Sequence, residues 1–391
     1  MGPPSSNKYL GVSRNVFVLG FVSFFNDVAS EMVYPLVPIF LTSVLGAPAS
    51  VVGLIEGVAE ATAGLLKVVS GWLSDRFGRR KPFVLAGYAF SAFSKLLLGL
   101  AGTWLTVLAA RFFDRLGKGA RTSPRDAMIA ESSAASNRGR SFGFHRALDT
   151  LGAVVGPLLA LWALDNLDDN YRLIFFLAFV PALVGVILLL FVVKDQHPKP
   201  LSTATFVFKW AALSKPFKQF LLISLIFALG NSSDAFLILR SQDLGLTVTT
   251  VVLVYVLFNL SYAVFSIPAG VVSDRIGPRP VLVIGFLLFS FVYLSFGLAE
   301  QTIFLFFLFP IYGIFMALTE GVGKAYISSM VPSGQFGTVF GIYQTAVGVC
   351  IFAASFLAGL LWTYVDASAP FIFGAGTALI ATVLLMTVAK Q

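Results

Sequence analysis

Residues 71–82, GWLSDRFGRRKP, recur 199 residues later as 270–280, GVVSDRIGPRP, and this repeat indicates the fold. Both copies keep a glycine, an aspartate, a second glycine and an arginine in register, and each follows the second apolar run of its half. A weaker echo at an offset of 198 pairs RDAMIAESSAASNRGRSFGFHR with GKAYISSMVPSGQFGTVFGIYQ. The chain is therefore an internal duplication, which predicts two bundles with the substrate path between them.

Apolar runs of about 20 residues, the length that crosses a bilayer as a helix, recur along all 391 residues. The chain is 57% hydrophobic and 12% charged, about half the charged fraction of a soluble domain. The expected helices are 14–41, 51–73, 82–101, 104–126, 140–164, 171–193, 217–240, 248–272, 280–299, 302–325, 338–363 and 369–389. The sequence predicts an all-α membrane protein, with twelve transmembrane helices in two six-helix bundles related by a pseudo-two-fold axis.

The expected domain organisation follows the duplication. It comprises a tail 1–13, a bundle 14–193, a linker 194–216 and a second bundle 217–391. In and just after the linker, four apolar residues follow one another at intervals of 4, 3 and 4, namely Phe206, Trp210, Leu213 and Phe217. This spacing is typical of an amphipathic helix at the membrane surface, although an ordinary linker with a few apolar residues fits it equally well.

Basic residues in the short connections predict the orientation. The tails and even-numbered connections hold sixteen Lys and Arg, whereas the odd-numbered connections hold only Arg172 and Arg240. Because such residues stay on the cytoplasmic side, we expect both termini to be cytoplasmic, in a multi-pass protein of a bacterial inner (plasma) membrane. The same asymmetry accounts for the net charge of +8 without a nucleic-acid partner.

The segment 109–133, AARFFDRLGKGARTSPRDAMIAESS, carries charges through an expected membrane helix. Within about 80° of one helix face lie Arg111, Asp114, Lys118, Arg121 and Arg125, with Arg115 about 40° beyond Arg111. A charge at the bilayer centre costs at least about 2.5 kcal/mol, so this stripe must face a protein interior, a wet cavity or partner carboxylates. We expect substrate contacts at Arg111, Asp114, Arg115 and Lys118.

Three acids in the first half are candidates for proton coupling. Asp27 and Glu31 are four residues apart and share a face of the first helix, and Asp149 lies in the fifth. A carboxyl group in a low-dielectric site can load and release a proton near neutral pH, and Asp27 is the first choice because it lies near mid-helix. Alternatively, these acids only neutralise the arginine stripe.

The second half is poorer in charge. Its candidates for a cavity wall are Asp234, Asn259, Tyr262 and Tyr343. Polar groups among aromatic rings suit a wall that orients an amphipathic ligand, but any one of them could equally serve helix–helix hydrogen bonding.

The two copies of the repeated loop predict a cytoplasmic gate. Asp75 and Asp274 end their helices beside turns that glycine permits, and such carboxylates can cap a neighbouring helix or pair with arginine when this side closes. The expected gate residues are Asp75, Arg76, Arg80, Glu131, Asp274 and Arg275. For the arginines, a role in topology alone is the alternative reading.

These motifs resemble those of the major facilitator superfamily over essentially the whole chain. GWLSDRFGRRKP is similar to its loop signature, and Arg111 falls on its fourth-helix arginine, although Arg115 stands where a glycine usually sits. Gly143, Gly152 and Gly156-Pro157 are similar to its antiporter motif, with Ala160-Leu161 in place of the closing glycine pair. The resemblance implies a twelve-helix secondary transporter and favours export.

The sequence as a whole predicts proton-coupled transport of a small organic solute by alternating access, with export favoured. The alternatives are symport-type uptake of an organic anion and, in another class, a non-transporting receptor or scaffold. No phosphate-binding loop and no nucleophile–base pair appears, and only two histidines are present. We therefore expect no enzyme, no cofactor and no metal site. The expected partners are the solute, H⁺ and the lipid bilayer, around a monomer.

Overall fold

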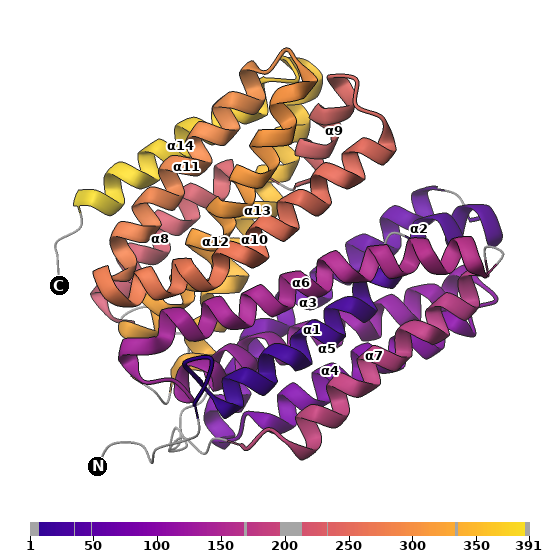
Figure 1. The fold of residues 1–391 in the computed structure, drawn as a ribbon, viewed down its shortest axis with the longest axis horizontal. Helices are drawn as coiled ribbons and strands as arrows, with labels where there is room; N and C mark the ends of the chain where they lie inside the picture. The colour runs from indigo at the N-terminus through magenta and orange to yellow at the C-terminus, as the bar shows by residue number, and fades with distance from the viewer. Residues whose placement is uncertain are drawn as a thin grey trace. The chain divides into compact units, whose positions relative to one another are not determined.

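The computed structural model describes residues 8–34, 36–47, 49–167, 170–195, 213–232, 234–332 and 335–387. It begins with a short hairpin, β1 (Lys8–Tyr9) and β2 (Val12–Ser13). The helices of the first half are α1 (Arg14–Val33), α2 (Leu36–Ile39), α3 (Ala49–Phe77), α4 (Lys81–Gly99), α5 (Trp104–Glu131), α6 (Arg138–Asn166) and α7 (Tyr171–Phe191). Those of the second half are α8 (Lys215–Gly230), α9 (Ala235–Asp243), α10 (Val248–Ile276), α11 (Pro278–Leu298), α12 (Leu305–Ser329), α13 (Phe336–Tyr364) and α14 (Ala369–Thr387). Figure 1 colours them in chain order.

Ten of the twelve expected spans are single helices, and two are interrupted. The span 14–41 divides between α1, which ends at Val33, and α2, which begins at Leu36. The span 217–240 divides between α8 and α9. Among the described residues, nine helices are long and apolar enough to cross a membrane. The possible surface helix in the linker falls largely on 196–212, outside the described residues.

Helix contacts divide the chain into two compact units. The first unit comprises 1–134, 148–206 and 332–342, and the second comprises 135–147, 207–331 and 343–391. The start of α13 therefore packs within the first unit, and the start of α6 packs within the second.

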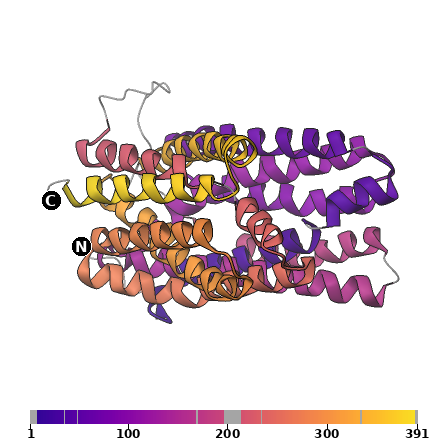
Figure 2. The same cartoon turned by 90° about the horizontal axis from the view of Figure 1, so that it is seen from above.

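The duplication in the sequence recurs in the packing inside each unit. In the first unit, α4 packs against α5 and α7, α3 packs against α5, and α1 packs against α7. In the second unit, α11 packs against α12 and α14, α10 against α12, and α8 against α14. The yellow α14 runs beside the orange α11 in both views (Figures 1 and 2). Each pairing in the first unit thus has its counterpart one repeat later.

The interiors of the two units differ in chemistry. An apolar cluster in the first unit includes Phe40 and Phe175, which meet edge to face at 5.3 Å. The second unit is filled with stacked rings, such as Phe227 on Phe286 at 4.1 Å. Such ring pairs add to the stabilisation that area burial provides.

The sequence assigned Arg172 and Arg240 to odd-numbered connections, but they lie in α7 and α9, and both donate to carbonyls at helix ends. Arg172 donates to the carbonyl of Ala101, just after α4, at 3.2 Å. Arg240 donates to the carbonyls of Phe296 and Ala299, around the end of α11, at 3.2 and 3.1 Å. The last carbonyls of a helix lack partners within the helix. Local capping therefore explains both exceptions to the loop asymmetry.

Candidate substrate, proton and gating sites

The charged stripe on α5 is largely buried. Of the expected substrate contacts, Arg111, Asp114 and Arg115 are buried, whereas Lys118 is exposed. Asp114 accepts a hydrogen bond from Lys95 of α4 at 2.7 Å, and an Arg111 nitrogen lies 3.9 Å from it. The carboxylate of Asp114, the acid of the stripe, is therefore paired with the buried Lys95 of α4.

The later part of the stripe is held by polar and aromatic groups. Arg121 donates to the hydroxyl of Ser91 at 2.5 Å, and its guanidinium lies 4.6 Å from the centre of the Tyr88 ring. Arg125 lies 3.2 Å from the neighbouring carboxylate of Asp126. Contact with a ring face stabilises a cation by about 0.5–2 kcal/mol. The expectation that the stripe avoids lipid therefore holds for these arginines.

The three coupling candidates differ in how they are held. The Ser23 hydroxyl donates to Asp149, whereas Asp27 accepts a long hydrogen bond from its neighbour Asn26 at 3.4 Å. Within the described residues, neither Asp27 nor Glu31 forms an ion pair. Asp27 and Glu31 therefore lie near basic side chains of α5 without forming an ion pair among the described residues.

α6 approaches α1 closely at these two acids. An added Cβ at Gly152 would lie 2.9 Å from the Cβ of Asp27, and one at Gly156 would lie 2.8 Å from the Cβ of Glu31. Glycines four residues apart let two helix backbones meet. Gly152 and Gly156 of α6 therefore lie directly against Asp27 and Glu31.

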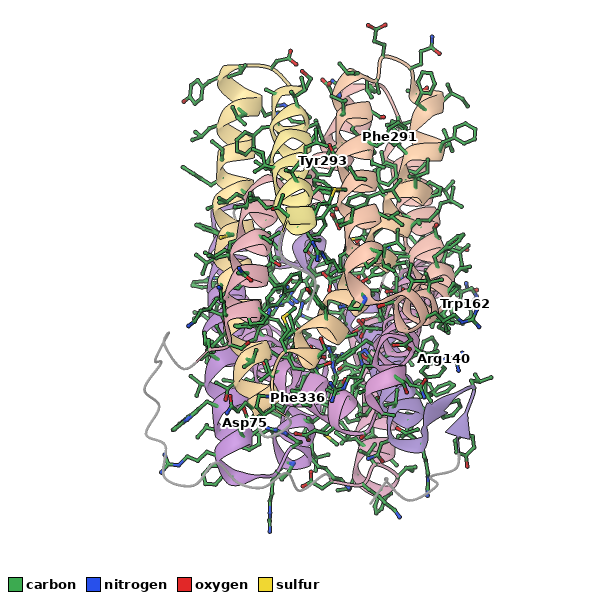
Figure 3. The ribbon with its side chains drawn as sticks, turned by 90° about the vertical axis from the view of Figure 1, so that its left-hand side faces the viewer. Asp75, Arg140, Trp162, Phe291, Tyr293 and Phe336 are labelled. Atoms are coloured by element: carbon green, nitrogen blue, oxygen red, sulfur yellow. The ribbon has the colours of Figure 1, made fainter. Side chains whose placement is uncertain are left out.

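At the end of α3, Asp75 caps the start of α13. Its carboxylate accepts hydrogen bonds from the backbone of Gly337 at 3.2 Å and of Thr338 at 2.5 Å, and from the Thr338 hydroxyl. Arg80 pairs with Asp75 and also with Glu131, at 2.8 Å from the latter. Figure 3 shows Asp75 beside Phe336, the first residue of α13. We call these five residues, Asp75, Arg80, Glu131, Gly337 and Thr338, the Asp75 cluster.

Burial and charge act against each other in this cluster. Burial opposes the charge on Arg80, but the carboxylates of Asp75 and Glu131 outweigh it, so the pKa of the guanidinium lies above its ordinary value. Burial raises the pKa of the Glu131 carboxyl, although Arg80 acts in the opposite direction. Arg80 therefore stays charged and holds both acids.

The second copy of the loop makes the equivalent contact in the second unit. Asp274 accepts hydrogen bonds from the backbone of Gly139 at 2.7 Å and of Arg140 at 2.8 Å, at the start of α6. These N–H groups occupy the same positions in α6 as those of Gly337 and Thr338 in α13. We call Asp274, Gly139 and Arg140 the Asp274 cluster. The first copy of the repeated loop, with Asp75, thus caps α13 of the second half. The second copy, with Asp274, caps α6 of the first half.

The turns before the next helices use glycine as expected, with φ of 60° at Gly78 and 90° at Gly277, a region that favours glycine. Arg76 and Arg275, expected in the gate, are exposed. Arg76 lies over the Trp72 ring at 5.2 Å. In the described part of the chain, both arginines stay outside the two clusters.

Close helix contact beside the Asp75 cluster leads to a prediction about glycine. An added Cβ at Gly71 would overlap the carbonyl oxygen of Gly337, whereas one at Gly64, on the same helix, would meet nothing within 4 Å. We expect Gly71→Ala to destabilise the protein by about 1–3 kcal/mol through overpacking. Gly64→Ala should stabilise it by about 0.5–1 kcal/mol through helix propensity. Thermal unfolding midpoints compare the two, and shifts of the same sign and size would contradict the contact.

The four candidates in the second unit are held by different groups. Asn259 donates to the carbonyl of Tyr255 on its own helix at 3.1 Å. The ring of Tyr343 lies parallel to that of Phe220 at 5.9 Å. Tyr262 is buried, and the Arg146 guanidinium lies 5.8 Å from its ring centre.

Asp234, at the interruption between α8 and α9, accepts a hydrogen bond from Tyr312 at 2.8 Å. Sequence reasoning missed Tyr312, and it also missed that Lys95 pairs with Asp114 and Arg146 with Glu320, the latter at 3.0 Å. A charge isolated in an apolar run was the available signal for Lys95. Nothing in the pattern marked Tyr312.

A family model described as Major Facilitator Superfamily matches residues 19–240 and 220–390. An uncharacterised MFS-type transporter of Methanocaldococcus jannaschii is 39% identical over 381 residues, covering 96% of this chain and 95% of the relative. The multidrug resistance protein MdtH of Aeromonas hydrophila is 30% identical over 163 residues, 42% of this chain and 38% of its own. Among solved structures, the human organic anion transporter MFSD10 has a TM-score of 0.80 at 17% identity, covering 95% of this chain and 99% of its own.

Proposed function

Because this chain belongs to the Major Facilitator Superfamily, we propose that it exports a small organic solute in exchange for protons by alternating access. The family and its transporter-named relatives make the chain a multi-pass membrane transporter of a small solute and not an enzyme. They also set aside a non-transporting receptor or scaffold. The coupling ion, direction and substrate are the proposal.

Proton coupling is supported above all by the lack of an ion pair at Asp27 among the described residues. This half-buried carboxylate has no ion pair among the described residues. Inside a membrane protein, an acid without a paired base is costly when charged and is most often part of an ion or proton path. Glu31, four residues away, also has no ion pair among the described residues. We propose that Glu31 and Asp149 assist Asp27 in proton coupling as neighbouring acids.

Coupling would act through the charges that face Asp27. Arg121 and Lys118 of α5 attract its ionised form, whereas Asp149 of α6 and Glu31 of α1 repel it. Proton binding removes all four interactions at once. A ligand that binds two conformations unequally shifts their populations, so proton binding would favour one facing state over the other.

The direction is supported by the partial similarity to the multidrug resistance protein and by the glycines of α6 that lie against the acids. Uptake of an organic anion by symport is the second candidate. It is favoured by Lys118, the exposed base on the α5 stripe, and by the 3.9 Å separation between Arg111 and Asp114, since arginine suits carboxylates. Substrate contacts are proposed at the stripe in the first unit.

The proposed gate is the pair of Asp75 and Asp274 clusters. Each would hold the start of one helix, α13 or α6, while the cytoplasmic side is closed. The exposed Arg76 and Arg275 would contribute topological charge. In the second unit, substrate contacts are proposed at Asp234, Asn259, Tyr262 and Tyr343. Cytoplasmic termini, a bacterial inner membrane and a monomeric state stay predictions.

We expect Asp27→Asn to uncouple transport. One proton moving down a gradient of one pH unit supplies about 1.4 kcal/mol, enough for a tenfold accumulation of solute. Proteoliposomes with this gradient would be tested with ethidium as an amphipathic probe and benzoate as an anionic one. The wild type should accumulate ethidium, and the variant should only equilibrate it.

The matched control is Asp366→Asn, in the exposed connection between α13 and α14. The Ser368 hydroxyl and backbone hold the pKa of Asp366 below its ordinary value, so it is already ionised and the control should transport normally. An unchanged pH dependence in Asp27→Asn would remove Asp27 from coupling. Proton-driven accumulation of benzoate instead of ethidium would favour the second candidate.

A further inference from the structure

The second unit contains an interruption between α8 and α9 that the proposed coupling through Asp27 does not involve. α8 ends at Gly230 and α9 begins at Ala235. An added Cβ at Gly230 would lie 2.9 Å from the Cα of Gly374, so α8 ends where it presses against α14. The end of a helix leaves backbone carbonyls without helical partners. The interruption is therefore a polar point inside a unit filled with aromatic rings.

Two buried tyrosines converge on this point. The Tyr312 hydroxyl of α12 donates to the carboxylate of Asp234 at 2.8 Å, and the Tyr293 hydroxyl of α11 donates to the carbonyl of Ser232 at 3.4 Å. Tyr312 is 1% exposed and Tyr293 is fully buried, whereas Asp234 is half-buried. Figure 3 labels Tyr293, between the helices of this unit. The carboxylate is thus held by a hydroxyl donor rather than by a base.

No cation balances Asp234 in the described part of the second unit. The titratable groups that face it are Tyr312 and Glu320 of α12 and Tyr293 of α11. Glu320 is itself an acid, paired with Arg146 at 3.0 Å. The described parts of α8, α10 and α14 present no charge to Asp234. A lone carboxylate in such surroundings is costly while ionised, and neutralising it removes that cost.

A proton fits this site better than a metal cation. Hard cations such as Mg²⁺ and Ca²⁺ require about six or more oxygen ligands, and the same preference for oxygen limits Na⁺. Around Asp234 the carbonyl of Ser232 already accepts from Tyr293. The neighbouring space is taken by rings, with Phe258 at 5.3 Å from Tyr312. A proton needs only the carboxylate oxygen itself.

We propose that Asp234 is a second proton-carrying site, in the half of the chain that lacks Asp27. A proton from water bonds to one carboxylate oxygen and gives the neutral acid, while the Tyr312 hydroxyl continues to donate to the carboxyl group. Release returns the proton to water and restores the ion. The role of this step in transport rests on the proposed proton coupling, but proton binding itself does not.

Infrared spectroscopy of the full chain in lipid, titrated with H⁺ in light and heavy water, measures the neutral acid directly. The wild type should show the carbonyl stretch of a protonated carboxylic acid, and Asp234→Asn should lose one such contribution. Tyr312→Phe keeps the ring and the acid but removes the hydrogen bond to the ionised form. Its titration midpoint should move about one pH unit higher, a tenfold gain in proton affinity.

Asp366→Asn serves as the control and should leave the band near neutral pH unchanged, because hydrogen bonds from Ser368 hold the pKa of that carboxyl below its ordinary value and keep it ionised. A band that keeps its amplitude in Asp234→Asn, or a midpoint that does not move in Tyr312→Phe, would overturn the proposal. Loss of the band when sodium chloride replaces choline chloride at constant pH would assign the site to Na⁺ instead. The infrared measurement needs no gradient and no solute. The proposal for Asp234 can therefore be overturned while Asp27 still couples transport, and Asp27 can be removed from coupling while Asp234 still binds a proton.

Discussion

Asp75→Asn is expected to lower the unfolding temperature of the purified protein strongly, and to release the start of α13 from α3. Asp75 and Arg80 are both fully buried and paired. Removing one partner of a buried ion pair costs about 3–5 kcal/mol, because the other charge is left uncompensated. The variant also loses the negative charge that the N-terminus of α13 favours. Thermal unfolding gives the first effect, and hydrogen exchange at Thr338 gives the second.

Two variants calibrate this result. Arg76→Ala, one position later and exposed, should change stability by about 0.5 kcal/mol or less. Asp274→Asn should cost about 0.5–2 kcal/mol, the range for a lost helix cap, because Asp274 is half-buried and holds two backbone N–H groups. Equal losses in Asp75→Asn and Arg76→Ala would contradict the buried pair.

Asp114→Asn should be comparably harmful, because it would leave Lys95 charged inside the first unit. Lys95 is 2% exposed and lies 2.7 Å from Asp114, and its hydrogen bond to Ser30 is longer, at 3.3 Å. We expect a loss of about 3–5 kcal/mol, measured by thermal unfolding in one detergent.

A double-mutant cycle isolates the pair. Lys95→Met combined with Asp114→Leu removes both charges and keeps similar volumes, so it should recover most of the stability that Asp114→Leu alone loses. Losses that simply add would show that Lys95 and Asp114 do not interact.

Most of the secondary structure could be predicted from the sequence, because a membrane helix is a local property. Length and apolarity set the spans, and hydrogen bonds inside one segment satisfy the backbone. The same locality limited the prediction at 217–240, which is mostly apolar and was expected to be one helix, yet divides between α8 and α9. The close approach of Gly230 to α14 involves residues far apart in the chain.

The candidate sites were predicted only in part, for a related reason. A period of 3.6 residues places charges on one helix face, and this correctly grouped Arg111 with Asp114 and Arg115. It cannot say what the facing helix offers, so Lys95 and Tyr312 were missed. Proximity in sequence does not report burial either, since Arg76 and Arg275 adjoin the repeated acids Asp75 and Asp274 but are exposed.

The membrane class, the duplication and the placement of charge on one helix face follow from the amino-acid sequence, because each depends on composition, period or repetition along one chain. Which charges are paired depends on the packing of the helices. That packing assigned Lys95 to Asp114, left Asp27 and Asp234 without a base among the described residues, and set Asp75 at the start of α13. The physical reason is that pairing energy falls off within a few ångströms, so it depends on contacts between helices that no local pattern records.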